Sequence, residues 1–144
     1  MQPDYVYRCS VTRVVDGDTV DADIDLGFDI IYRDRIRLMG IDTPESRTRN
    51  RKEKALGLAS KARLKELIKA GKKEVVLKTS KEGKGKFGRI LGTLYAGGEN
   101  LCEVLMNEGH ARPYFGGSKN AQGPWTREMN GKWERWTKDG YVDL

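Results

Sequence analysis

Two short acidic motifs hold the residues of this sequence that are best suited to do chemistry. Asp18 lies in the segment VVDGDTV, and Asp42 lies in the segment GIDTPE. Hard divalent cations such as Ca²⁺ and Mg²⁺ prefer oxygen ligands, so two carboxylates with water completing the shell suit them. The two motifs can converge at one rim of a small barrel if each ends a neighbouring strand. The pattern therefore predicts a divalent metal site that contains Asp18 and Asp42.

The residues that follow Asp42 add two further functional groups. Pro44 favours an extended backbone at Thr43, which ends the strand and can turn the Thr43 carbonyl outward as a neutral third ligand. Glu45 comes next, where its carboxylate could accept a proton from a water molecule in the site. An ordinary Asp-Pro turn would explain this segment alone, but not its combination with DGDT and the flanking arginines.

Two arginines extend the acidic pair into a site for an anionic substrate. Arg37 precedes Asp42 by an odd number of residues, so a bulge or twist is needed to bring it to the same rim. Arg89 follows the glycine-rich segment KGKFG, from which it could approach a phosphate from the opposite side. Guanidinium groups bind phosphate oxygens in a bidentate manner and stay charged at neutral pH.

Charge is distributed unevenly along the chain. Residues 1–46 carry 5 Lys or Arg and 10 Asp or Glu, residues 47–89 carry 16 and 4, and residues 90–144 carry 6 and 7. A cationic region attracts polyanions, whereas an acidic cluster beside it would repel them unless a cation lay between. This pattern indicates a metal-dependent enzyme that acts on nucleic acid. The alternative is that the Lys-rich segments form only solvated surface.

Two further patterns resemble known sites and fail in detail. The acids of DADIDLG suggest a calcium loop, but the glycine falls one position late and the twelfth position is Tyr32. We interpret the segment as a strand whose acids face water and whose apolar residues point inward: Val20, Ala22, Ile24 and Leu26. The segment GKGKFGR lacks the order of a phosphate-binding P-loop and is interpreted as a basic hairpin loop.

The spacing of His110 and of the two cysteines assigns them no chemistry. His110 is the only histidine and has no Ser or Cys partner that spacing could nominate, so we interpret it as structural. Cys9 and Cys102 lie far apart, with no Cys/His spacing for zinc, and are interpreted as buried reduced thiols.

The elements that must position these residues follow from periodicity. At 144 residues we expect one domain. Alternating residues 5–26 predict two strands joined at Asp16-Gly17, residues 28–42 a third strand, and residues 73–80 and 89–96 another hairpin. Residues 52–73 predict a helix that ends near Gly71, and Asn100 as N-cap predicts a short second helix. Spacings of four, four and three residues predict one face of a third helix: Trp125, Met129, Trp133 and Trp136.

Three motifs, in order, resemble the staphylococcal-nuclease-like (thermonuclease) family. They are VTRVVDGDTV, IRLMGIDTPE and KFGRILGTLY, followed by EVLMNEGHA, and the resemblance covers roughly residues 8 to 115. It implies an α+β fold in which a five-stranded OB-type barrel carries three α-helices, in one domain over residues 1–144. It also implies a phosphodiesterase that cleaves DNA and RNA with Ca²⁺ at the P–O5′ bond and leaves 3′-phosphate ends.

The same resemblance assigns a role to individual residues. The family's metal ligands fall on Asp18, Asp42 and the Thr43 carbonyl. Its base-like glutamate falls on Glu45, and its two phosphate-binding arginines fall on Arg37 and Arg89.

The expected substrate-binding residues include one departure from the family and one position that the alignment leaves open. Phe87 stands where the family has a tyrosine, so a hydroxyl contact to a terminal phosphate is missing, while ring packing on a base or sugar can remain. This leaves the balance between endonuclease and exonuclease cleavage open. A second family tyrosine falls near Tyr114 or Phe115. With the basic hairpin loop, the expected substrate-binding set is Lys84, Lys86, Phe87 and Tyr114.

The expected partner is nucleic acid, and the expected metal is Ca²⁺, with replacement by Mg²⁺ or Mn²⁺ left open. The segment MQPDYVYRCS lacks the features of a signal peptide, and no segment reaches the roughly 18 apolar residues of a membrane span, so we expect an intracellular protein that resembles phage-carried members. We also expect a monomer. Two alternatives are a non-catalytic nucleic-acid-binding OB-type module, which the intact acids and arginines argue against, and a barrel that binds a protein tail.

Overall fold

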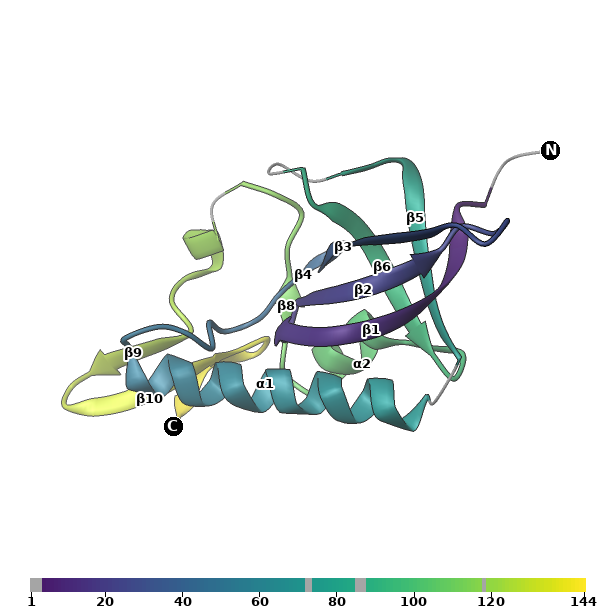
Figure 1. Ribbon diagram of the computed structural model, residues 1–144. Helices are drawn as coiled ribbons and strands as arrows, with labels where there is room; N and C mark the ends of the chain where they lie inside the picture. The colour runs from purple at the N-terminus through teal and green to yellow at the C-terminus, as the bar shows by residue number, and fades with distance from the viewer. Residues whose placement is uncertain (1–3, 72–73, 85–87, 118) are drawn as a thin grey trace.

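The computed structural model describes residues 4–71, 74–84, 88–117 and 119–144, with the backbone alone for residues 80–84, 119 and 120. These residues form a closed five-stranded barrel, with one long helix along its side and a small sheet beside the start of that helix (Figure 1). The strands are β1 (Val6–Asp16), β2 (Thr19–Asp25), β3 (Ile31–Leu38), β4 (Ile41–Asp42), β5 (Val75–Lys84), β6 (Ile90–Ala96), β7 (Glu99–Asn100), β8 (Arg112–Pro113), β9 (Thr126–Met129), β10 (Lys132–Thr137) and β11 (Gly140–Asp143). The helices are α1 (Arg51–Ala70), α2 (Leu101–Asn107) and the 3₁₀ turn η1 (Lys119–Gln122).

The barrel is built from β1, β2, β3, β5 and β6. Antiparallel pairing gives the order β3-β2-β1-β5-β6, and parallel pairing of β3 with β6 closes the sheet on itself. The turn at Asp16-Gly17 connects β1 to β2, with Asp16 opposite Thr19. The predicted five-stranded OB-type barrel is therefore confirmed.

Alternation along β2 supplies part of the barrel core. Val20, Ala22 and Ile24 are at most 2% exposed, as the period of two predicts. Leu26 was expected to point inward as well, but 42% of its surface is exposed, because β2 ends at Asp25 and Leu26 already belongs to the turn.

The acids on the outer face of β2 do more than face water. Asp21 accepts a hydrogen bond from Arg35 at 2.8 Å, and Asp23 accepts one from Arg33 at 2.7 Å, both across the β2–β3 pair. These guanidinium groups lower the pKa of both carboxyls. Cross-strand ion pairs, rather than a metal, therefore explain the DADID pattern.

Helix α1 covers β1 and buries Leu64 and Leu67 against the barrel (Figure 1). Asn50 begins the helix by accepting hydrogen bonds from the backbone N–H groups of Lys52 and Glu53. The helix ends at Gly71, as the sequence predicts. Asn100 caps α2 in the same way, by accepting hydrogen bonds from the backbone N–H groups of Cys102 and Glu103.

The predicted third helix is wrong, and residues 126–143 form the three-stranded sheet β9-β10-β11 instead. The reason is the Asn130-Gly131 pair, in which both residues have positive φ, as a tight hairpin turn between β9 and β10 requires. Trp125 is buried while Trp133 is 38% exposed, so the tryptophans do not share one docking face. The described chain thus has two α-helices, and neither is long and apolar enough to cross a membrane.

Candidate active site

Asp18 lies in the turn between β1 and β2, and its carboxylate reaches the end of β4. It accepts hydrogen bonds from the Thr19 hydroxyl at 2.9 Å and from the Thr43 backbone N–H at 3.2 Å. A Cβ on Gly17 would stand 2.8 Å from Ser60 Cβ and 3.1 Å from Thr43 Cγ2, so glycine permits this close approach. The structure thus brings the DGDT and IDTPE motifs together at one rim of the barrel.

Arg37 lies at the end of β3 and belongs to the same rim. Its Nη2 atom lies 3.5 Å from Asp18 Oδ2, and its Nη1 donates to the Leu38 carbonyl at 2.9 Å. The residue is only 6% exposed, and Nη2 has no hydrogen-bond partner within the part of the chain that the structure describes. A turn at Gly40, with φ of +82°, separates β3 from β4, so the odd spacing to Asp42 does not place Arg37 on the opposite face.

Asp42 and Thr43 are buried at the end of β4 and provide the other oxygen atoms of the rim. The Thr43 hydroxyl is buried and has no hydrogen-bond partner among the described residues. No group of three or more His, Cys, Asp or Glu side chains that could hold a metal occurs in that part of the chain. A hard divalent cation would therefore rely on Asp18, Asp42 and neutral oxygens, and the orphaned hydroxyl beside two carboxylates fits that donor set.

Glu45 lies at the edge of this rim, where α1 holds its backbone. Its N–H donates to Glu53 Oε2 at 3.0 Å, and a Cβ on Gly57 would stand 2.4 Å from the Glu45 carbonyl oxygen. Glu45 itself is exposed. The close contact with Gly57 fixes the backbone from which the Glu45 carboxylate extends.

Arg89 immediately precedes β6, and two residues later Leu91 pairs with Arg37 of β3. Arg89 is half-buried. The barrel closure thus brings both predicted phosphate-binding arginines to neighbouring strands. Of the other predicted substrate contacts, Lys84 is described by its backbone alone, and Lys86 and Phe87 lie outside the described residues.

Tyr114 lies beside the site and contacts Arg37. The Arg37 guanidinium carbon lies 5.7 Å from the centre of the Tyr114 ring, and the Tyr114 hydroxyl donates to the Gly117 carbonyl at 2.9 Å. Phe115, the alternative position for the family tyrosine, is 90% exposed. Tyr114 is therefore the aromatic residue of this pair that adjoins the buried arginine.

Arg112 is a residue of the site that the sequence analysis did not find. It is 1% exposed on β8, which pairs with β4, and its Nε lies 3.4 Å from Asp42 Oδ2. Its guanidinium carbon lies 4.1 Å from the Trp125 ring centre and 5.5 Å from that of Trp136. The two indoles meet edge to face at 5.6 Å. The C-terminal sheet thus encloses the cation that neutralises Asp42.

His110 and the cysteines play no part in this rim. The Ser60 hydroxyl lies 3.5 Å from His110 Nδ1 and donates to the His110 carbonyl at 2.9 Å, a partner that spacing could not nominate. Ser60 is only 1% exposed, so this contact is structural. Burial lowers the pKa of His110 and raises the pKa of Cys9 and Cys102 to about 11, as expected for buried thiols.

A comparison with known protein families identifies the family to which this chain belongs. The sequence model of the family described as staphylococcal nuclease homologue matches residues 35–134, well over half of the chain. The chain belongs to the staphylococcal nuclease homologue family. The matched residues include Arg37, Asp42, Glu45 and Arg89, whereas Asp18 precedes them.

Relatives of this staphylococcal nuclease homologue carry names of nucleases. The chain is 30% identical over 142 residues to endonuclease YncB of Bacillus subtilis (strain 168), and this covers 92% of the chain and 63% of the relative. It is 31% identical to the SPbeta prophage-derived endonuclease YokF of the same organism, over 92% of the chain and 45% of the relative. It is 37% identical over 105 residues to the thermonuclease of Staphylococcus intermedius, over 73% of the chain and 58% of the relative. The chain thus spans roughly half to two-thirds of the length of these relatives.

Proposed function

We propose that this protein is a metal-dependent nuclease that hydrolyses phosphodiester bonds of DNA and RNA with Ca²⁺ and acts as a monomer. The observation that carries the proposal is the contact of the Asp18 carboxylate with both the Thr43 N–H at 3.2 Å and the Arg37 guanidinium at 3.5 Å. It places one acid of the proposed metal-binding pair beside the residue that follows the other acid, Asp42, and beside a phosphate-binding group. The names of the relatives support the same activity, and the prophage-derived endonuclease among them supports a phage-type origin.

Asp18, Asp42 and the Thr43 carbonyl would hold the metal. When bound, Ca²⁺ would supply Lewis-acid chemistry by offsetting the charge of the scissile phosphate. The two carboxylates have the right character because oxygen ligands suit a hard cation. Their buried position limits competition from bulk water, which strengthens the electrostatic interactions at this rim.

The remaining residues act on the water molecule and on the phosphate. Glu45 would accept a proton from the attacking water, because it is a carboxylate held at the edge of the rim by Gly57. Arg37 and Arg89 would donate hydrogen bonds to the phosphoryl oxygens as their charge grows in the transition state. The in-line reaction would break the P–O5′ bond and leave a 3′-phosphate.

Digestion of single-stranded DNA, duplex DNA and RNA in Ca²⁺, Mg²⁺ and EDTA tests the proposal. The control is the Asp18→Ala/Arg37→Ala variant, and the ends of the products are analysed for 3′-phosphate. Cleavage that needs Ca²⁺, leaves 3′-phosphates and is lost in the variant supports the proposed enzyme. Intact nucleic acid with retarded migration in every lane would favour the binding module instead.

A further inference from the structure

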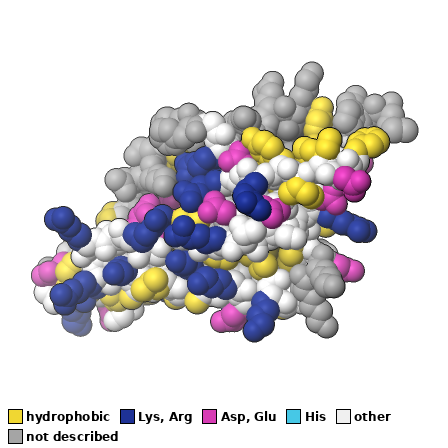
Figure 2. Space-filling model, viewed as in Figure 1, with side chains coloured by type: hydrophobic (Ala, Val, Ile, Leu, Met, Phe, Trp, Pro, Cys, Tyr) yellow, Lys and Arg dark blue, Asp and Glu magenta, His cyan; other side chains and the backbone are white. Residues whose placement is uncertain are grey.

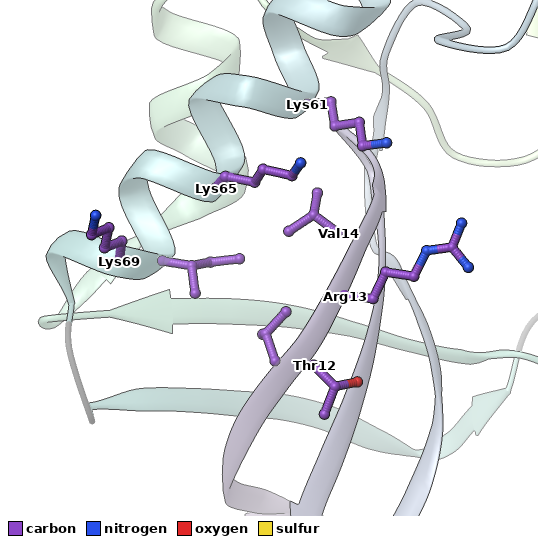
Figure 3. A pocket seen from close by; sticks show the side chains of 8 residues that line it. Thr12, Arg13, Val14, Lys61, Lys65 and Lys69 are labelled. Carbon is purple, nitrogen blue, oxygen red and sulfur yellow. The ribbon is translucent and has the colours of Figure 1, made fainter.

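A cationic groove runs between β1 and α1, outside the candidate active site. Its volume is about 460 Å³. Figure 3 shows lysines from successive turns of α1 on one side of it and residues of β1 on the other. The lining residues are Val11, Thr12, Arg13, Val14, Lys61, Lys65, Ile68 and Lys69.

The three lysines form a regular positive row. Lys61, Lys65 and Lys69 are spaced by four residues, which places them about 6 Å apart along the helix axis. None of them forms an ion pair with the residues that the structure describes. Their combined charge is thus available to an anionic ligand, and the row of about 12 Å is long enough to face more than one phosphate of a nucleic acid strand.

Arg13 of β1 adds a fourth cation beside the groove, and its guanidinium extends away from the lysines of α1 (Figure 3). Arg13 lies across from Asp21 in the β1–β2 pair, and the carboxylate of Asp21 is already occupied by Arg35 at 2.8 Å. Between the two walls, Val14 and Ile68 offer apolar surface. A cationic wall with apolar surface beside it suits a sugar-phosphate chain, in which charged phosphates alternate with less polar sugars.

The groove is continuous with the candidate active site along β1. From Arg13 the strand runs three residues further, about 10 Å at the rise of a strand, to Asp16 at the start of the turn that holds Asp18. Arg47 lies 3.8 Å from Asp16 on this path and is largely exposed. Figure 2 shows Lys and Arg side chains gathered over this face of the molecule, along α1 and toward the end of the barrel.

We propose that this groove binds the sugar-phosphate backbone of the nucleic acid substrate several nucleotides away from the bond that is cleaved. The proposal rests on the proposed function for its choice of nucleic acid. The groove begins about 10 Å of strand from the turn that holds Asp18, and its lysine row extends about 12 Å along α1, so a strand must reach well beyond the cleaved bond to fill it. Long strands therefore gain contacts that short substrates lack.

A binding measurement in EDTA tests the groove without any cleavage. The variant Lys61→Gln/Lys65→Gln/Lys69→Gln removes the row, and glutamine keeps the helix propensity of lysine nearly unchanged. The matched control is Lys78→Gln/Lys132→Gln/Lys138→Gln, which removes the same charge from exposed positions on other elements. Fluorescence anisotropy measures the Kd for a labelled 20-nucleotide DNA strand across a series of salt concentrations.

We expect the groove variant to bind the strand about 10- to 100-fold more weakly than the control at 0.1 M salt. The slope of log Kd against the logarithm of the salt concentration should be smaller than that of the control by about 2, or about 0.7 for each lost phosphate contact. For a dinucleotide, the Kd values of the two variants should be equal. Equal Kd values and slopes for the 20-nucleotide strand would overturn the proposal. Loss of binding to vesicles of phosphatidylserine and phosphatidylcholine, without loss of DNA binding, would also overturn it.

The groove and the proposed function can fail separately. If the wild-type protein cleaves neither the 20-nucleotide strand nor the dinucleotide in Ca²⁺, the proposed function fails, while the anisotropy comparison still decides the groove. If cleavage is normal and the two lysine variants bind alike, only the groove proposal is refuted.

Discussion

The buried ion pair between Arg112 and Asp42 leads to a prediction about stability. Arg112→Leu removes the cation and leaves the Asp42 carboxylate, which is 4% exposed, without its charge partner at 3.4 Å. Breaking a buried pair in this way costs about 3–5 kcal/mol of unfolding free energy, and the lost contact with the Trp125 ring at 4.1 Å adds to that cost. For a chain of this size the melting temperature should fall by about 10–20 °C.

Urea unfolding in EDTA, followed by circular dichroism, measures this loss. The double variant Asp42→Asn/Arg112→Leu separates the charge effect from lost packing, because it removes both charges of the pair. We expect it to be more stable than Arg112→Leu alone. Added Ca²⁺ should stabilise Arg112→Leu more than the wild-type protein, since the ion offsets the negative charge that Arg112 no longer balances. A loss below about 1 kcal/mol, or a double variant less stable than Arg112→Leu, would refute this reasoning.

Three further predictions address single residues. Gly57→Ala should lower stability by about 1–3 kcal/mol and slow cleavage, since the new Cβ would stand 2.4 Å from the Glu45 carbonyl; urea unfolding and a cleavage assay check this. Burial lowers the pKa of His110 in the folded protein, so the unfolded chain takes up a proton at higher pH than the folded chain does. The stability should therefore fall as the pH drops below about 6.5. Thermal melts across this pH range should show a weaker trend for His110→Gln. Arg89→Ala should lower kcat by about 100- to 1,000-fold in Ca²⁺, and normal turnover would exclude its role at the phosphate.

Local patterns predict most of the barrel. The strands β1 and β2 follow from alternation, and α1 follows from its helix-forming residues and its end at Gly71. The failure at residues 125–136 has a local cause, because Asn130-Gly131 is a hairpin signal that outweighs a helical spacing of tryptophans. In a short segment, apolar residues spaced three or four apart can therefore also lie in strands.

The candidate site is predictable only in part, since its residues come from distant segments. The motif positions indicate Asp18 and Asp42, whereas the buried pairing of Asp42 with Arg112 depends on how β4 meets β8. The position of Arg37 relative to Asp42 depends likewise on the turn at Gly40, and the alternation of a regular strand does not predict that turn. Contacts of this kind arise from tertiary structure and leave no periodic signal in the sequence.

The most direct test of the proposed nuclease compares two acids of the same strand region. Asp18 lies at the rim with Arg37 and Thr43, whereas Asp21 lies on the outer face of β2 and pairs with Arg35. The measurement is the single-turnover rate at which a 5′-labelled oligonucleotide is cleaved in Ca²⁺ by Asp18→Asn and by Asp21→Asn. We predict a loss of about 100-fold or more for Asp18→Asn and a rate near that of the wild type for Asp21→Asn. Equal rates for the two variants would contradict the assignment of the active site to this rim.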